Sequence, residues 1–94
     1  KVKIIDLRWL SDINIGNLMK SVGKCSKILI VDECRKNGCY GEGLVTDIFS
    51  ASNRPLKIRL HAAENSFIPL GKAATVTLPS KESIIDNAIE LYNE

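Results

Sequence analysis

The chain contains the stretch Lys27-Ile28-Leu29-Ile30-Val31-Asp32-Glu33, which is its strongest strand signal. The apolar residues from Ile28 to Val31 follow one another without a polar interruption. A continuous apolar centre of this kind is typical of a strand buried on both faces, as in a parallel sheet covered by helices. The stretch therefore predicts an α/β fold.

Two more strands are predicted, one before this stretch in the sequence and one after it. Residues Val2 to Leu7 are mostly β-branched and are bounded by charge. Residues Leu56 to His61 alternate apolar with charged side chains, which gives this strand one more polar face. The third strand is therefore expected nearer the edge of the sheet than the second.

Three helices are predicted, because apolar residues recur at helical spacing in three places. Their apolar faces are Ile15, Leu18, Met19 and Val22; Leu44, Val45, Ile48 and Phe49; and Ile84, Ile85, Ala88, Ile89 and Tyr92. Asn14 or Asp12 is expected to cap the first helix and Gly23 to end it. Pro55 breaks the second helix, and Ser80 is expected to cap the last.

The alternation of strands and helices predicts right-handed crossovers. The fold class is therefore a three-layer α/β/α domain with a mainly parallel, open sheet, and residues 1–94 are expected to form one domain. Residues 62–78 show no helical period and carry Pro69 and Gly71. Within them, residues 75–78 are expected to form a short extended piece.

Composition narrows the classes of function. Of the 94 residues, 45% are apolar and 26% are charged, with a net charge of +2, the mixture of an ordinary soluble domain. This near balance excludes a nucleic-acid or polybasic membrane module argued from bulk charge. The longest apolar run, Ile28 to Val31, is far shorter than the roughly 20 residues that span a membrane.

The cysteines indicate a reducing, cytosolic-type compartment. Cys25, Cys34 and Cys39 form no CxxC pair, and His61 is the only histidine, so the spacing does not fit a structural zinc site. An odd number of cysteines also disfavours a secreted disulfide framework. A nucleophilic pair of Cys34 and His61 beyond the strand ends is disfavoured too, because nothing in the sequence marks Cys34 as activated.

The glycine-rich bend at residues 37–43 follows a strand and opens a helix, the setting of a phosphate-binding loop. It lacks the third glycine of the dinucleotide fingerprint and the Gly-Lys-Ser/Thr of a P-loop, and Glu42 places a negative charge there. The favoured interpretation is that Gly38, Gly41 and Gly43 allow a sharp turn and a close approach of the helix to the sheet.

Four motifs together resemble a known family. They are Ile4-Ile5-Asp6-Leu7-Arg8-Trp9-Leu10; Ile28-Leu29-Ile30-Val31-Asp32-Glu33; Gly38-Cys39-Tyr40-Gly41-Glu42; and Asn65-Ser66-Phe67-Ile68-Pro69-Leu70-Gly71 followed by Leu78-Pro79-Ser80 and Ile84-Ile85. In this order they resemble the C-terminal domain of transketolase-like thiamine diphosphate enzymes. The greatest resemblance is to the decarboxylating component (β-type half) of 2-oxo acid dehydrogenase complexes, including versions with both halves fused. The chain departs from the family pattern at Cys39, which replaces the second glycine of the bend, and at Glu64-Asn65.

The resemblance implies a supporting domain. In this family thiamine diphosphate and Mg²⁺ are held by the preceding domains, so no catalytic, cofactor-binding or metal residue is expected in this chain. The implied partners are those upstream domains, a subunit of a homodimer or heterotetramer, and the lipoyl acyltransferase core, with no nucleic acid and no membrane. By position, the residues implied for docking are Asn53, Arg54, Leu91 and Tyr92, and those for a domain interface are Arg8, Trp9 and Phe67.

The implied parent reaction is oxidative decarboxylation of a 2-oxo acid with acyl transfer to lipoamide, in the cytoplasm or, in a eukaryote, the mitochondrial matrix. The 94 residues alone are expected to be non-catalytic. Two alternatives stay open: the same domain of a transketolase-type carboligase, and an independent small anion- or nucleotide-binding α/β module.

The family domain begins one strand and one helix before the position of Lys1, so the chain is expected to be a fragment of a longer one. It should then expose an apolar edge beside the first strand, which a second copy would cover or which would cause aggregation.

Overall fold

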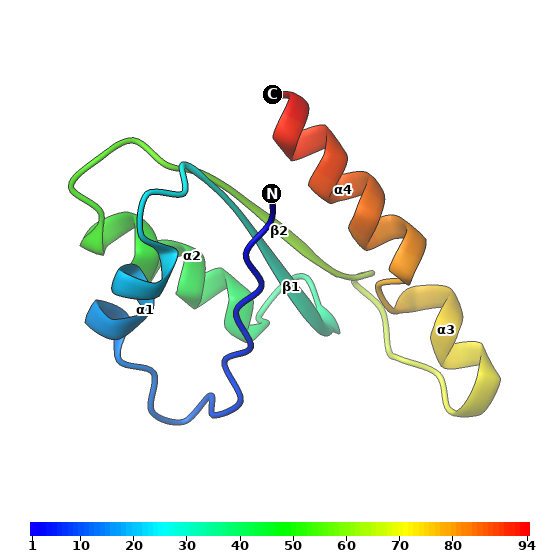
Figure 1. Cartoon of the computed structure of the whole chain (residues 1–94). Helices are drawn as coiled ribbons and strands as arrows, with labels where there is room; N and C mark the ends of the chain where they lie inside the picture. Colours follow the sequence, from blue (N-terminus) through cyan, green and yellow to red (C-terminus); the bar gives the residue numbers. More distant parts are fainter.

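Two parallel strands with helices on both of their faces form the centre of the molecule, as the computed structural model of residues 1–94 shows (Figure 1). In chain order the elements are α1 (Ile15–Val22), β1 (Lys27–Arg35), α2 (Tyr40–Ala51), β2 (Lys57–Ala63), the 3₁₀ helix η1 (Gly71–Ala73), α3 (Ala74–Thr77) and α4 (Lys81–Asn93). None of the helices has the length and apolar character needed to cross a membrane. The predicted α/β class is confirmed.

The first helix has the two ends that the sequence predicts. The Asn14 side chain accepts a hydrogen bond from the amide of Asn17 at 2.9 Å, which satisfies one free amide of the first turn. Gly23, at φ 59°, ends the helix and donates its own amide to the carbonyl of Met19. A residue with a Cβ would be strained in this backbone conformation, which explains why the helix ends at a glycine.

The sheet is parallel, with Lys27 opposite Lys57 and Asp32 opposite Ala62. The register shifts between Asp32 and Arg35. The expected burial of β1 on both faces is only partial, because the side chain of Val31 is 44% exposed.

One face of the sheet carries the apolar core. Leu18 of α1 and Leu44 and Ile48 of α2 are buried together, and the sheet residues Ile28, Ile30 and Ile58 pack against them, as do Leu7, Ile13, Ile15, Met19 and Leu56. Alternation along a strand sends every second side chain to the same face, which is why the sheet residues have even numbers. Burial of these aliphatic groups against α1 and α2 is the main stabilisation of this half of the molecule.

The glycine bend has the structural role that the sequence favours. Gly38 adopts φ 81°, which reverses the chain after β1. A Cβ on Gly41 would lie 2.6 Å from Leu60 Cδ1 and 3.4 Å from Ile30 Cγ2, so a larger residue there would displace the Leu60 side chain or move the start of α2 away from the sheet.

The other face is covered by α4, which starts at a capping box. Ser80 Oγ accepts the amide of Ser83 at 3.0 Å, and Ser83 Oγ accepts the amide of Ser80 at 2.9 Å. Leu91 is buried near the opposite end. The predicted helix and its Ser80 cap are confirmed.

The predicted strand at Val2 to Leu7 is wrong. Residues 1–9 contain no regular secondary structure, and the sheet has only the two strands β1 and β2. β-branched residues favour a strand only where a neighbouring strand takes their backbone hydrogen bonds, and none does so here. The edge expected beside a first strand is therefore not formed, although Val2 and Ile4 are highly exposed.

The extended piece predicted at residues 75–78 is also wrong, because η1 and α3 occupy residues 71–77. The amide of Leu78 donates to the carbonyl of Ala74 at 3.2 Å, and the Thr75 hydroxyl donates to the carbonyl of Lys72 at 2.8 Å. Pro69 precedes this turn of helix, and Gly71, at φ 64°, is its first residue, so neither residue interrupts it.

The molecule exposes more surface than its mass predicts. Its accessible surface is 7195 Å², and only 8 of 94 residues are buried. A compact monomer of 10.4 kDa would expose about 5,400 Å². The excess points to surface that is left for other polypeptide to cover.

Candidate interaction surfaces

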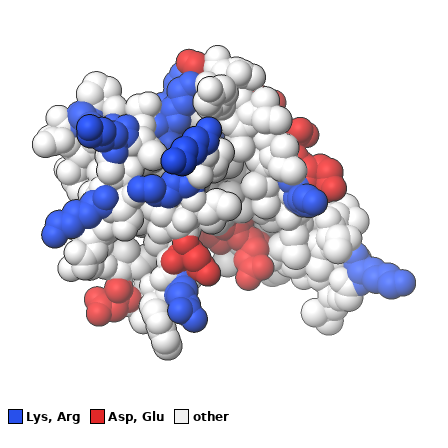
Figure 2. All heavy atoms as spheres, viewed as in Figure 1, with Lys and Arg blue, Asp and Glu red and all other residues white.

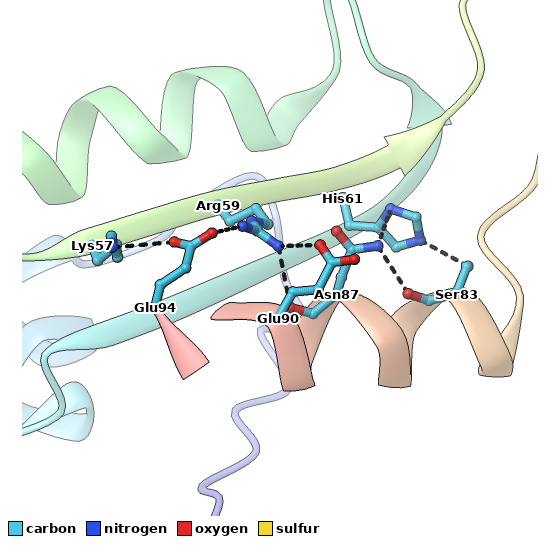
Figure 3. Close-up of polar contacts among 7 residues, drawn as sticks. All are labelled: Lys57, Arg59, His61, Ser83, Asn87, Glu90 and Glu94. Carbon is cyan, nitrogen blue, oxygen red and sulfur yellow. Dashed lines mark hydrogen bonds and ion pairs between the residues drawn. The ribbon is translucent and has the colours of Figure 1, made fainter. Parts of the chain in front are cut away.

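A row of polar side chains joins β2 to α4 (Figure 3). We call it the polar ladder; it consists of Lys57, Arg59 and His61 on β2 and Ser83, Asn87, Glu90 and Glu94 at the helix and its C-cap. The strand residues alternate, so all three point to the face opposite the apolar core. The helix residues are three or four apart and therefore share one side of α4.

Ion pairs form the C-terminal end of the polar ladder. Arg59 Nη1 lies 3.0 Å from Glu90 Oε2, and its other terminal nitrogen contacts Glu94. Lys57 Nζ lies 3.2 Å from Glu94 Oε2. Only a quarter of the Arg59 side chain is exposed, so these pairs are screened less than those of a fully exposed residue.

His61 forms the other end of the polar ladder. Its Nε2 lies 2.9 Å from Ser83 Oγ, and Asn87 Nδ2 lies 3.5 Å from its Nδ1. Because the Ser83 hydroxyl donates to the carbonyl of Ser80, a neutral imidazole with its proton on Nε2 satisfies both contacts. Both ring nitrogens are engaged with α4, so His61 is not paired with Cys34 as a general base.

An apolar side of α4 is left uncovered. Ile85, Ile89 and Tyr92 lie at helical spacing and are 45%, 53% and 73% exposed. We call these three residues the α4 flank. Lys27 of β1 donates to the Tyr92 carbonyl and lies 5.6 Å from the centre of the Tyr92 ring, so the flank lies on the β1 side of the helix.

The residues expected at a domain interface are on the surface. Trp9 is 75% exposed and Phe67 is 91% exposed. Arg8 adopts φ 56°, which is strained for this residue, and the Asp6 carboxylate accepts its amide at 3.1 Å. Phe67 also lines a shallow open hollow with Arg35, Asn37, Asn65 and Ser66.

The residues expected to dock a partner separate into two kinds. Asn53 and Tyr92 are exposed. Arg54 instead donates to the carbonyls of Gly23 and Cys25 at 2.6 and 2.7 Å, which ties the turn after α2 to the end of α1. Leu91 is 4% exposed and packs inside the molecule, so its prediction as a docking residue is wrong.

The chain's own carboxylates occupy the glycine bend. Glu42 Oε2 accepts the amide of Gly38 at 2.8 Å, and Asp32 Oδ2 accepts the amide of Gly41 at 3.0 Å. Burial opposes ionisation of Asp32, but hydrogen bonds from the amides of Cys34 and Gly41 and from the Cys34 and Cys39 thiols outweigh it and lower the pKa of this carboxyl. The bend therefore does not fit the diphosphate of thiamine diphosphate. No group of three or more His, Cys, Asp and Glu side chains could hold a metal ion.

Charge is unevenly spread over the surface. On the face shown in Figure 2, Lys and Arg side chains gather over the half that carries α1 and α2. The helix α4 is acidic, since Glu82, Asp86 and Glu90 outnumber its one basic residue, Lys81. Glu82 and Asp86 form no ion pair within the chain, so these carboxylates face solvent.

Comparison with known proteins finds relatives of the kind that the sequence motifs resemble. The chain is similar to pyruvate dehydrogenase E1 component subunit beta. It is 29% identical to the protein of that name from Staphylococcus aureus over 91 residues, which are 95% of this chain and 28% of the relative. For Staphylococcus epidermidis the identity is 30% over 89 residues, 93% of this chain and 27% of the relative. The chain thus spans a little over a quarter of these relatives' length.

No family model matches the chain. No solved structure matches it either. The similarity to the E1 beta subunits covers nearly the whole of this chain and a small part of each relative. It supports a relation to 2-oxo acid dehydrogenase E1 beta subunits and leaves the arrangement of the complete domain a prediction.

Proposed function

We propose that the chain is the C-terminal supporting, interface and docking domain of a thiamine diphosphate-dependent 2-oxo acid dehydrogenase. The parent enzyme would catalyse oxidative decarboxylation of a 2-oxo acid with acyl transfer to lipoamide, with its cofactor and Mg²⁺ held by other domains. The observation that carries the proposal is the similarity over 91 residues to the E1 beta subunits. The three-layer arrangement of the family domain and a cytoplasmic location belong to the same proposal.

The exposed apolar residues support an interface role. Trp9 and Phe67 are large aromatics with most of their surface in solvent. Large aromatics contribute more to interfaces than most residues, because they bury much area and lose little rotamer freedom. We therefore assign Arg8, Trp9 and Phe67 to contacts with the upstream domains or with a partner subunit.

The end of α4 supports docking of the lipoyl acyltransferase core. Tyr92 is exposed at the end of the α4 flank, and Asn53 is exposed at the turn after α2. The free carboxylates of Glu82 and Asp86 favour a partner surface that is basic.

Binding to the lipoyl acyltransferase of the same organism tests docking. We expect the intact protein to bind it, and Tyr92→Ala to weaken the affinity about tenfold, a typical loss for an exposed aromatic contact. Lys72→Ala is the matched control, because Lys72 is exposed on η1 and should leave binding unchanged. Wild-type protein that fails to bind would contradict the docking role.

Activity tests the parent reaction. With thiamine diphosphate and Mg²⁺, the complete enzyme should decarboxylate a 2-oxo acid, and the 94-residue chain should not. Turnover by the chain alone would contradict the proposal. Ketol transfer by the complete enzyme without acyltransferase binding would favour the transketolase-type carboligase.

The alternative of an anion-binding module has a test of its own. Gly38 and Gly41 already donate their amides to Glu42 and Asp32, so added nucleotide should leave the amide resonance of Gly41 unmoved. A saturable shift of that resonance would support the alternative.

A further inference from the structure

β1 has a free edge, because β2 is its only neighbour in the sheet. The amide of Lys57 donates to the carbonyl of Ser26 at 2.9 Å, and alternate residues of a strand turn their backbone groups to the same side. Before the register shift, the even-numbered residues of β1 therefore bond to β2, and the amides and carbonyls of Leu29 and Val31 point away from it. Neither of these two residues takes part in the backbone hydrogen bonds outside the helices and the sheet.

Nothing in the middle of β1 protects this edge. Natural edge strands are protected by proline, by bulges or by charged side chains. The run from Ile28 to Val31 contains no proline and no charge, and the register shifts only after Asp32. Val31 is exposed on the face that carries α4, and the α4 flank lies on the β1 side of its helix. A strand added to this edge would therefore cover both apolar patches.

The chain also carries a strand-forming segment without a partner. We call residues 2–6 the N-terminal arm; three of these five residues are β-branched. No residue of the arm forms a backbone–backbone hydrogen bond. Val2 and Ile4, which share one face of an extended chain, are 83% and 89% exposed. The Lys3 side chain donates to the Ser21 carbonyl in an exposed contact, so the arm loses little if it moves.

We propose that the N-terminal arm of a second copy of this chain adds as a strand to the free edge of β1, and that the two copies exchange arms reciprocally. The backbone of the arm takes the hydrogen bonds that Leu29 and Val31 leave open. With Val2 and Ile4 on the face of α4, the same strand covers the α4 flank. Reciprocal exchange closes the dimer, because each copy gives one arm and receives one.

The exposed area is sufficient for this exchange. The accessible surface of 7195 Å² is well above the roughly 5,400 Å² of a compact monomer, and each partner in a standard interface loses about 800 Å². A second copy is favoured over a foreign peptide, because the chain itself supplies both the unpaired arm and the free edge. Arm exchange does not depend on the proposed dehydrogenase function.

Amide hydrogen exchange, followed by NMR at rising concentrations of the 94-residue chain, tests the proposal. The Leu29 and Val31 amides should exchange about tenfold more slowly when about nine-tenths of the chains are associated, because exchange then occurs from the free tenth. The Ile30 amide faces β2 and is the internal control, since it should be protected at every concentration. In a mixture of isotope-labelled and unlabelled chains, filtered NOEs should connect the arm of one copy to β1 of the other.

Proline variants show whether the arm is the added strand. Ile4→Pro removes a backbone donor from a part of the chain that has no regular secondary structure, so it should abolish the slowing without unfolding the protein. Leu70→Pro is the matched control. Leu70 is 94% exposed in the loop before η1, and its φ of −83° accepts proline, so this variant should keep the slowing.

Three results would overturn the proposal. Leu29 and Val31 amides that are protected at every concentration would show that the chain's own arm pairs with β1. Slowing that survives Ile4→Pro would show that the edge pairs with another part of the second copy. Amides that stay unprotected at every concentration would show that the edge takes no strand. None of these results bears on binding of the lipoyl acyltransferase, so the proposed function is tested separately.

Discussion

Gly41 sets the distance between α2 and the sheet. Gly41→Ala should lower the free energy of unfolding by about 1–3 kcal/mol, because the added Cβ would lie 2.6 Å from Leu60 Cδ1 in a packed region. Gly43 is the matched control on the same helix, since a Cβ there meets nothing within 4 Å. Gly43→Ala should be neutral or stabilise the protein by up to about 1 kcal/mol. Urea unfolding of both variants measures the difference, and equal stabilities would contradict the close packing.

Asp32 controls the ionisation of Cys34. The Asp32 carboxylate is the largest cause of the raised pKa of the Cys34 thiol, and Glu33 is a smaller one. Asp32→Asn should therefore shift the pH profile of Cys34 alkylation to lower pH, and Glu33→Gln should shift it in the same direction by less. The rate is followed by mass spectrometry of the peptide that carries Cys34. Asp47→Asn, on the exposed side of α2, should leave the profile in place, and an unmoved profile in Asp32→Asn would remove the electrostatic cause.

Acid should weaken the link between β1 and α2. The pKa of Asp32 is lowered in the folded state, so its stabilisation is present above the pKa of an unfolded aspartate and is lost as the pH falls through the folded value. The expected contribution is about 1 kcal/mol, because the carboxylate keeps much of its contact with water. Urea unfolding at neutral and acidic pH should show a smaller loss in Asp32→Asn than in the wild type. An equal loss in both proteins would contradict this contribution.

At the scale of elements, α4 is attached differently from α1 and α2. Its contacts with β2 include the polar ladder, whereas α1 and α2 share the apolar core. Arg59→Met should destabilise the protein by about 1 kcal/mol and should make its stability less dependent on salt than that of the wild type. Lys81→Met is the control, because Lys81 is exposed and forms no ion pair. Urea unfolding at low and high salt gives both quantities, and an Arg59→Met protein with unchanged salt dependence would show that the ion pairs contribute nothing.

Elements with local signals could be predicted from the sequence. The Asn14 cap, the Gly23 end, the strand at Ile28 to Val31 and the Ser80 cap each depend on neighbouring residues, and all are confirmed. The Val2 to Leu7 strand could not be judged in this way, because a strand exists only with a partner that the local sequence does not specify. The short helix α3 has no apolar period and left no signal.

The sequence did not predict the polar ladder, because this feature too depends on a partner element that the local sequence does not specify. The alternation of Lys57, Arg59 and His61 predicted a polar face of β2, but not that an acidic helix would cover it. Which turn of α4 meets which strand residue is set by the length and path of residues 64–80. Those residues carry little periodicity, so the register of helix and strand could not be read from them. Exposure could not be predicted either, and it separates Tyr92 from the buried Leu91.

The whole molecule has too little buried surface for an isolated monomer. Its accessible surface exceeds that of a compact monomer by about 1,800 Å², more than the roughly 800 Å² that each partner loses in a standard interface. A radius of gyration of 13.9 Å, against about 12.4 Å for a compact chain of this length, agrees with an open shape. Large uncovered apolar areas favour association in water. We therefore expect the 94-residue chain by itself to self-associate as its concentration rises.

The N-terminal segment should contribute to this association, since Val2 and Ile4 are 83% and 89% exposed and no strand pairs with them. Val2→Ser combined with Ile4→Ser should shift sedimentation toward the monomer, because two β-branched side chains then no longer lose contact with water on association. Val76→Ser is the control, as Val76 is 77% exposed on α3, away from that segment, and should change sedimentation less. A wild-type chain that stays a single monomeric species at every concentration would show that the exposed surface needs no partner, and would count against an interface role for this domain.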